Sequence, residues 1–314
     1  MGERVKISLD ELAEHRLEQD IYNREGQLLL KKGNLLTADV IANLKKRGIS
    51  EVYANTDLAP EEVPEPQPQV PVQVEEVYGK ALDFVKNFLQ DIKHETKIDV
   101  AEIKNTLGAL SHHRFSDSDL LVQLRRIKEK DEYLYTHSIN VAILSSMIGR
   151  WLELDEITVE KLGVAGMLHD VGKVYIPEEI LQKPGKLTEY EYAVMKNHSA
   201  IGYRLCQNTK ALDAQVLNAV LMHHERADGS GYPAQVGLGR IPQEALIVSV
   251  ADTYDAITSK RVYSEKRSPY VAAEIILRES LAGKMDRRIS KVFYDRILRL
   301  SIGNIVKLSN NEIG

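Results

Sequence analysis

Two adjacent histidines run directly into a glycine-rich loop in the sequence HHERADGSGYP, which spans His223 to Pro233. Neighbouring imidazoles at the end of a helical segment suit two different roles. They can lie on the surface of an ordinary helix end, or they can ligate a metal ion, because imidazole is the commonest metal ligand in proteins. The choice between these roles depends on whether other potential ligands share the same setting.

Five histidines lie on stripes of apolar residues, where an unpaired imidazole would be costly. These histidines are His137, His169, His198, His223 and His224. A single buried histidine is most often a core residue with a hydrogen-bond partner. Five of them in one chain favour metal binding instead.

Carboxylates accompany these histidines. Asp170 directly follows His169, and Asp252 and Asp255 lie three residues apart on an otherwise apolar helical face that includes Val248. Isolated charges avoid protein cores unless they are paired or ligate metal. A carboxylate beside a histidine can bridge two ions. Imidazole and carboxylate together suit Fe, Mn or Zn rather than Ca or Mg.

The other four histidines give the opposite interpretation. His15, His94, His112 and His113 lie in polar, charged surroundings. Even the adjacent pair His112 and His113 falls in SHHRFSDSD, which is typical of a loop before a helix. We expect all four to be surface residues.

The elements that must position the candidate ligands are almost all helical. Amphipathic segments begin near Val77, Asp117, Asp131, Thr158, Thr188, Asp213, Pro242 and Ser268. Thr188 and Glu191 have the spacing of a capping box at a helix start. The sequence therefore predicts a mainly α fold for the larger part of the chain.

A proline-rich stretch divides the chain. Five of its ten prolines fall between Ala59 and Val74, mixed with Glu and Gln, which predicts an extended linker over residues 58–76. The preceding residues 1–57 predict a small α/β module, in which Thr37 caps a helix carrying Val40, Ile41 and Leu44 on one face. This module has no catalytic constellation, so we expect a regulatory or docking role.

Composition limits the functional class. The 314 residues carry a net charge of −5, which argues against broad binding to nucleic acid polymers. The single cysteine, Cys206, excludes an intramolecular disulfide and suits a reducing compartment. The sequence has neither a signal-peptide pattern nor a run of about 18 apolar residues that could insert in a membrane. We expect a cytoplasmic protein.

These motifs occur in a familiar order. His137 is followed by MLHDVGK, IPEEILQKPGKLTEYEYAVMKNH, HHERADGSGYP and VADTYDAITSKRVY. This order resembles HD-GYP domains, a branch of the HD metal-dependent phosphohydrolases. The resemblance runs from about residue 117 to residue 302 and implies an HD-type helical bundle within a domain of residues 77–314. Residues 1–57 resemble, more weakly, a small domain often fused to HD-GYP proteins.

The resemblance implies an activity. HD-GYP proteins hydrolyse the bacterial second messenger cyclic di-GMP to linear pGpG, and some degrade it to GMP, through a hydroxide that bridges metal ions. Nearby cations acidify such a water and neutralise charge on the phosphoryl oxygens. A mixed-base cyclic dinucleotide is an alternative substrate, and signalling protein partners and a homodimer are further expectations.

The resemblance also assigns residues to roles. The implied metal ligands for two transition-metal ions, Fe or Mn, are His137, His169, Asp170, His198, His223, His224 and Asp252. Lys173 would add positive charge toward the scissile phosphate. Asp255 would orient a water or protonate the leaving oxygen, or would form a structural hydrogen bond. The implied substrate contacts are Lys173, Gly231, Tyr232, Pro233 and Arg261.

The sequence departs from the fullest family pattern at two positions. Tyr133 stands where some relatives carry a glutamate that supports a third metal ion, so we expect a dinuclear centre. Ser264 stands where some relatives carry a basic residue. Three alternatives therefore stay open: a catalytically silent cyclic-dinucleotide sensor, a phosphohydrolase acting on nucleoside polyphosphates, and a helical scaffold with incidental histidines.

Overall fold

The chain forms two compact units in the computed structural model, one of Met1–Gln69 with Leu298–Gly314 and one of Val70–Ile297. The structure describes residues 5–9, 17, 20–23, 28–32, 34–46, 49, 51–54, 72–95, 98–111, 114–126, 133–259 and 267–301. Most of the predicted linker, residues 58–71, lies outside this part. The helix that follows begins at Val72 rather than Val77, so the end of the predicted linker is helical.

The first unit is a small α/β module. Its strands are β1 (Val5–Ser8), β2 (Ile21–Tyr22), β3 (Leu28–Leu30) and β4 (Glu51–Ala54), in the sheet order β1-β4-β2-β3 with antiparallel pairing. Helix α1 (Ala38–Lys46) accompanies them, and the Val40 amide donates to the Thr37 hydroxyl at its start. Val40, Ile41 and Leu44 are buried in its core, as the sequence pattern predicted.

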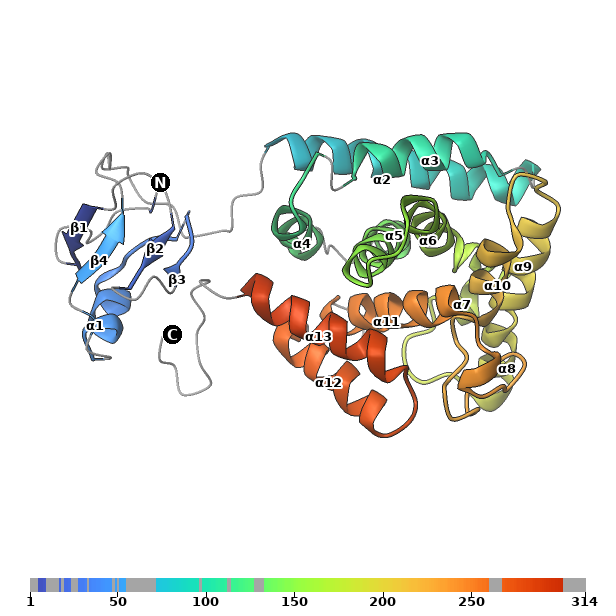
Figure 1. The fold of residues 1–314 in the computed structure, drawn as a ribbon. Coiled ribbons are helices and arrows are strands. Elements are labelled where there is room, and N and C mark those ends of the chain that lie inside the picture. Colours follow the sequence, from blue (N-terminus) through green and yellow to red (C-terminus); the bar gives the residue numbers. More distant parts are fainter. Residues whose placement is uncertain are drawn as a thin grey trace. The chain divides into compact units, whose positions relative to one another are not determined.

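The second unit is helical (Figure 1). Its α-helices are α2 (Val72–Glu95), α3 (Val100–Ala109), α4 (Asp117–Arg126), α5 (Tyr133–Trp151), α6 (Glu156–Leu168), α7 (Glu178–Leu181), α8 (Glu189–Lys196), α9 (His198–Gln207), α10 (Ala214–Met222), α11 (Gln243–Thr258), α12 (Pro269–Leu281) and α13 (Arg287–Ser301). The 3-10 helices η3 (Val171–Tyr175) and η4 (Leu238–Arg240) lie between them. The prediction of a mainly α fold is confirmed.

Helices α5 and α6 form the centre of this unit, with α2 and α3 on one side and α11 on the other (Figure 1). Helix α5 is buried along most of its length and α6 is buried from Leu162 to Leu168, so apolar residues occur on every side of both segments. Gly166 allows them to approach closely, because a Cβ atom there would lie 2.7 Å from the backbone of Val141 and Ala142. This contact sets the position of the α6 C-terminus, where His169 and Asp170 follow.

Gly166→Ala should destabilise the helical unit, because backbone atoms cannot move aside as a flexible side chain can. Overpacking of this kind costs about 1–3 kcal/mol, and denaturant unfolding would measure it. Gly79→Ala in α2 is the matched control, since a Cβ there meets nothing within 4 Å. It should stabilise the unit by about 0.5–1 kcal/mol. Equal stability of the two variants would contradict the close packing of α5 on α6.

Candidate metal centre

The candidate ligands come from helix ends and helix faces that meet in the interior of the second unit. His137 lies on α5 and Asp252 on α11, while His169 and Asp170 follow the C-terminus of α6. The remaining three histidines are at the first residue of α9 and at the end of α10: His198, His223 and His224. Helix α8 ends at Lys196, so His198 begins a new helix rather than continuing the segment that begins near Thr188.

Hydrogen bonds to the backbone fix the tautomer of three buried imidazoles. The Nδ1 atoms of His169, His198 and His223 lie 2.7, 2.8 and 2.8 Å from the carbonyl oxygens of residues 166, 195 and 220. A carbonyl oxygen only accepts, so each Nδ1 must carry the proton. In the neutral ring the Nε2 atom then presents a lone pair, which is the arrangement of a metal-ligating histidine.

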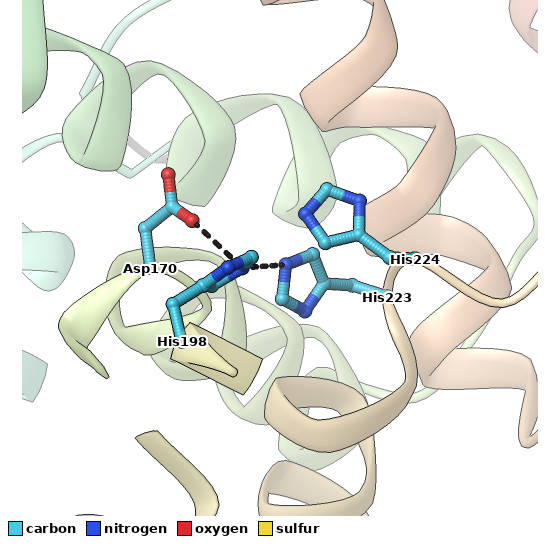
Figure 2. Close-up of side chains that lie close together, drawn as sticks. All are labelled: Asp170, His198, His223 and His224. Atoms are coloured by element: carbon cyan, nitrogen blue, oxygen red, sulfur yellow. Dashed lines mark hydrogen bonds and ion pairs between the residues drawn. The ribbon is translucent and has the colours of Figure 1, made fainter. Parts of the chain in front are cut away.

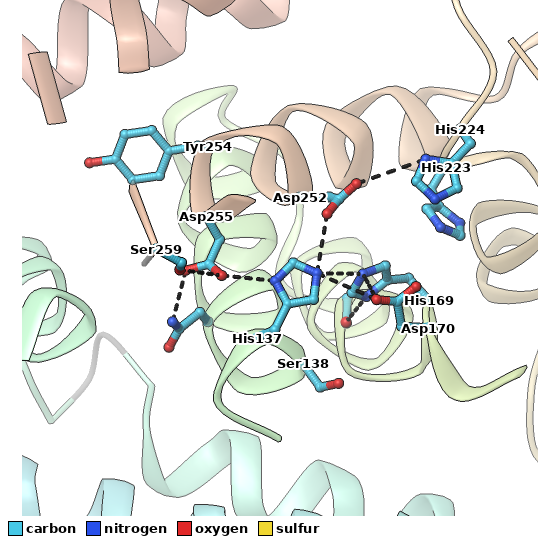
Figure 3. Close-up of polar contacts among 12 residues, drawn as sticks. His137, Ser138, His169, Asp170, His223, His224, Asp252, Tyr254, Asp255 and Ser259 are labelled. Atoms are coloured by element: carbon cyan, nitrogen blue, oxygen red, sulfur yellow. Dashed lines mark hydrogen bonds and ion pairs between the residues drawn. The ribbon is translucent and has the colours of Figure 1, made fainter. Parts of the chain in front are cut away.

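These lone pairs face one another. The Nε2 atoms of His198 and His223 are 3.4 Å apart, and those of His137 and His169 are 3.3 Å apart (Figures 2 and 3). Asp170 and Asp252 add carboxylate oxygens 3.5 and 3.2 Å from the Nε2 of His137. Lone pairs and carboxylates held this close in a buried space repel unless a cation lies between them.

The pKa values of the candidate ligands agree with metal binding. Burial lowers the pKa of His198, lowers that of His223 well below its usual range, and lowers that of His224 to about 3. Burial would raise the pKa of Asp170 and Asp252. The Lys173 ammonium beside Asp170, and the His137 imidazole 3.2 Å from Asp252, outweigh this effect and hold the pKa of both carboxyl groups well below the usual range. At neutral pH His198, His223 and His224 are therefore neutral imidazoles, while Asp170 and Asp252 are ionised carboxylates, the forms that bind metal.

The spacing of the donors fits metal ions. Ligands about 2.1 Å from one ion lie about 3.0–3.4 Å apart at octahedral or tetrahedral angles, close to the separations above. The donors form two groups, one of Asp170, His198, His223 and His224 and one of His137, His169 and Asp252, and within each group the ligand atoms lie within 4.8 Å of one another. In addition, the buried Asp170 Oδ1 has no hydrogen-bond partner among the described residues.

Asp255 takes a different position from the catalytic one considered from the sequence. Its carboxylate lies behind His137, accepting from Nδ1 at 2.8 Å, and from the Ser259 hydroxyl at 3.1 Å (Figure 3). The Asn140 amide donates to its other oxygen at 2.8 Å, and the buried Tyr78 hydroxyl of α2 donates to Asn140 at 2.6 Å. Asp255 is 1% exposed, and these hydrogen bonds favour the structural alternative over orienting a water or protonating a leaving group.

Lys173 lies in η3, and its ammonium is 2.5 Å from the Asp170 Oδ2. The approach of η3 to α9 depends on Gly172, since a Cβ there would lie 2.0 Å from the carbonyl oxygen of His198. Gly172, the glycine of the MLHDVGK motif, thus allows Asp170 and Lys173 to lie against the start of α9. The sequence interpretation did not assign this role to Gly172.

The glycine-rich loop folds back on the two histidines that precede it. A Cβ on Gly231 would lie 2.4–2.5 Å from backbone atoms of residues 224–226, so only glycine fits. The neighbouring Tyr232 ring lies 4.7 Å from the His224 ring, and burial raises the pKa of its phenol, which stays a neutral O–H donor. Pro233 is exposed beside it. The structure thus places the loop at the edge of the metal-ligand cluster.

A buried carboxylate that the sequence interpretation missed holds this loop. Glu225 is 1% exposed, and it accepts from the backbone N–H groups of Ala234, Gln235 and Val236 at 2.6, 3.1 and 3.1 Å. The sequence signal for this role was the position of Glu225, directly after two candidate ligands and before the glycine-rich loop. Three N–H donors compensate for burying the charge.

Some predicted positions fall outside the part of the chain that the structure describes. Arg261 and Ser264 lie in residues 260–266, and His15, His112 and His113 are also outside it. Tyr133 begins α5 and His94 is near the end of α2, but their side chains are not described. Their predicted roles stay predictions.

Comparison with known proteins assigns the fold to a family. A family model described as HD domain matches residues 121–289. The chain belongs to the HD domain family. Its motif order places it among HD-GYP proteins, and an HD domain with these histidine and aspartate clusters binds divalent metal.

Two curated relatives and one solved structure show how far the likeness extends. A cyclic di-GMP phosphodiesterase of Pseudomonas aeruginosa is 34% identical over 75% of this chain and 56% of its own length. A cyclic di-GMP phosphodiesterase of Thermotoga maritima is 40% identical over 50% of this chain and 42% of its own length. The chain thus spans about half the length of these relatives.

An HDG"Y"P protein from Bdellovibrio bacteriovorus has a similar fold, with a TM-score of 0.59 over 94% of this chain and 100% of that one, at 17% identity. Among the described residues of the HD-GYP chain, no helix has the length and apolar character needed to cross a bilayer.

Asp255→Asn should weaken metal binding by about 10–100-fold, the usual effect of losing a partner that orients a ligating histidine. An asparagine presents one oxygen and one NH₂ group where two oxygens now accept, so either His137 or Asn140 loses its acceptor. Competition with a chromogenic chelator would measure the affinity. Asp295→Asn removes the same charge from an exposed position of α13 and should leave the affinity unchanged. Equal affinities for the two variants would contradict the orienting role.

Proposed function

We propose that this HD-GYP protein is a metal-dependent phosphodiesterase that hydrolyses cyclic di-GMP to linear pGpG, and further to GMP. The observation that carries the proposal is the convergence of imidazole lone pairs and ionised carboxylates in a buried space. The curated relatives support the substrate, since both are named cyclic di-GMP phosphodiesterases.

In this proposal the ligands divide between two ions. His137, His169 and Asp252 would hold one ion, and the other would be held by His198, His223 and His224. Asp170 would bridge the two, because its Oδ2 lies 3.3 Å from the Nε2 of His169 while its Oδ1 lies 3.4 Å from that of His198. Mixed imidazole and carboxylate donors favour Fe or Mn. Such a pair of ions would supply an activated water and would neutralise charge on the phosphodiester.

Residues of the chain itself would bind and orient the substrate beside the metal ions. The Lys173 ammonium is partly exposed beside Asp170, where it can also meet a phosphoryl oxygen. Gly231, Tyr232 and Pro233 would form the wall against which the cyclic dinucleotide lies. Arg261 would pair with its second phosphate.

The domain organisation suggests how the activity is controlled. The first unit has its own buried core, including Leu9, Ile21, Leu36 and Val52. We propose that residues 1–57 form a regulatory module that contacts signalling partners or a second copy of the chain, with residues 58–71 as its linker.

The decisive experiment combines metal analysis with a product assay. Protein purified without oxygen should contain about two transition-metal ions per chain and should linearise cyclic di-GMP. Asp170→Ala should abolish hydrolysis and remove most of the metal, because it deletes the bridging ligand. Asp295→Ala, an exposed aspartate on α13, should match the unmodified protein in both measurements.

Two results would overturn parts of the proposal. If Fe- or Mn-loaded protein binds cyclic di-GMP tightly but leaves it intact, the protein is a sensor rather than an enzyme. If a mixed-base cyclic dinucleotide is hydrolysed much faster than cyclic di-GMP, the substrate assignment is wrong while the metal centre stands.

A further inference from the structure

Helix α8 presents an aromatic side chain and a cation at the edge of the metal-ligand cluster. The Tyr192 ring is half exposed and meets the Tyr232 ring edge-to-face, with centroids 6.5 Å apart. The Lys196 ammonium lies 5.0 Å from the Tyr192 centroid and 6.0 Å from the Tyr232 centroid. We call Tyr192, Lys196 and Tyr232 the aromatic ledge.

The ledge continues outward from the candidate ligands. Tyr232 lies at its inner end, with its ring 4.7 Å from that of His224 and 6.3 Å from that of His198. Tyr192 lies at its outer end, where half of its surface meets solvent. A substrate whose phosphate reached the cluster would therefore extend its attached groups over the ledge.

The ledge is held rigidly on both sides. The first turn of α8 is fixed by a capping box of Thr188 and Glu191, and Lys183 binds the Glu191 carboxylate at 2.6 and 2.8 Å. The loop that carries Tyr232 is held by the buried Glu225. An exposed aromatic side chain on so well-anchored a short helix is preorganised for a ligand, which lowers the entropy cost of binding.

The chemistry of the ledge matches a guanine base. Tyrosine faces stack on nucleobases, and a lysine ammonium donates to the O6 and N7 acceptors of guanine. Adenine carries an amino donor in place of O6, which an ammonium disfavours. We propose that Tyr192 stacks on one guanine of the substrate and that Lys196 donates to its O6 and N7, so that this pair selects guanine over adenine. This proposal rests on the function proposed above.

The first test separates base binding from the metal centre. Tyr192→Ala should raise the KM for cyclic di-GMP about 5- to 150-fold, the range for loss of one base–aromatic stack, with a smaller change in kcat. Tyr192→Trp should restore the KM. Hydrolysis of methyl p-nitrophenyl phosphate, a diester without a nucleobase, should be unchanged, as should the metal content.

Tyr190→Ala is the matched control on the same helix. Tyr190 is 77% exposed, and two residues along a helix correspond to a rotation of about 200°, which points it away from the ledge. Its KM for cyclic di-GMP should equal that of the unmodified protein. A Tyr192→Ala variant that behaves like Tyr190→Ala would overturn the proposal, and so would one that loses metal or small-diester hydrolysis.

The second test addresses selectivity. Lys196→Met should lower kcat/KM for cyclic di-GMP at least several-fold more than for cyclic di-AMP, and Lys196→Arg should preserve the preference, because arginine also donates to O6 and N7. If Lys196→Met leaves the ratio of kcat/KM for cyclic di-GMP to kcat/KM for cyclic di-AMP unchanged, the proposal that Lys196 recognises guanine is wrong. If the unmodified protein hydrolyses methyl p-nitrophenyl phosphate but neither cyclic dinucleotide, the proposed function is wrong. In that case a direct titration with GMP, comparing the unmodified protein with Tyr192→Ala, still tests whether the aromatic ledge binds guanine.

Discussion

The structure depends on one electrostatic constraint: several imidazole lone pairs and two carboxylates point into the same buried space. Each of His169, His198 and His223 donates its Nδ1 proton to a carbonyl of the preceding helical turn. That bond leaves the Nε2 atoms no proton with which to bond one another, although they lie within hydrogen-bonding distance. Unlike an ordinary polar core, this arrangement cannot satisfy itself internally. It requires cations, which is why the chemistry follows from the fold.

The same constraint explains how the helices are arranged. Most of the donors are at helix termini, where the chain can turn and bring two neighbouring residues, such as His169 and Asp170 or His223 and His224, into one cluster. The close approach of these ends is permitted by glycines: Gly166 between α5 and α6, and Gly172 between η3 and α9. Binding of ions would therefore also stabilise the fold, because the native cluster is assembled only when these helices are packed.

The sequence predicted the helical fold and the residues that would meet, because histidine and aspartate on apolar stripes are costly anywhere else. It predicted less about how they meet. Asp255 shares the helical face of Asp252, and periodicity alone cannot tell a residue that faces the cluster from one that lies behind His137. The buried Glu225 and the chain from Tyr78 through Asn140 depend on contacts between segments far apart in the sequence, which no local pattern encodes.

The division of labour between Asp252 and Asp255 illustrates how one helix serves both functions. One helical turn separates them, so both point toward α5, but Asp252 reaches the Nε2 side of His137 and Asp255 reaches the Nδ1 side. The His137 imidazole is thus held between two carboxylates. Asp255 accepts the Nδ1 proton, and Asp252 lies beside the Nε2 lone pair. Because Asp255 also accepts from Asn140, which in turn accepts from Tyr78 of α2, the orientation of His137 is coupled to the first helix after the linker. A displacement of α2 would be transmitted to the metal centre through three consecutive short hydrogen bonds.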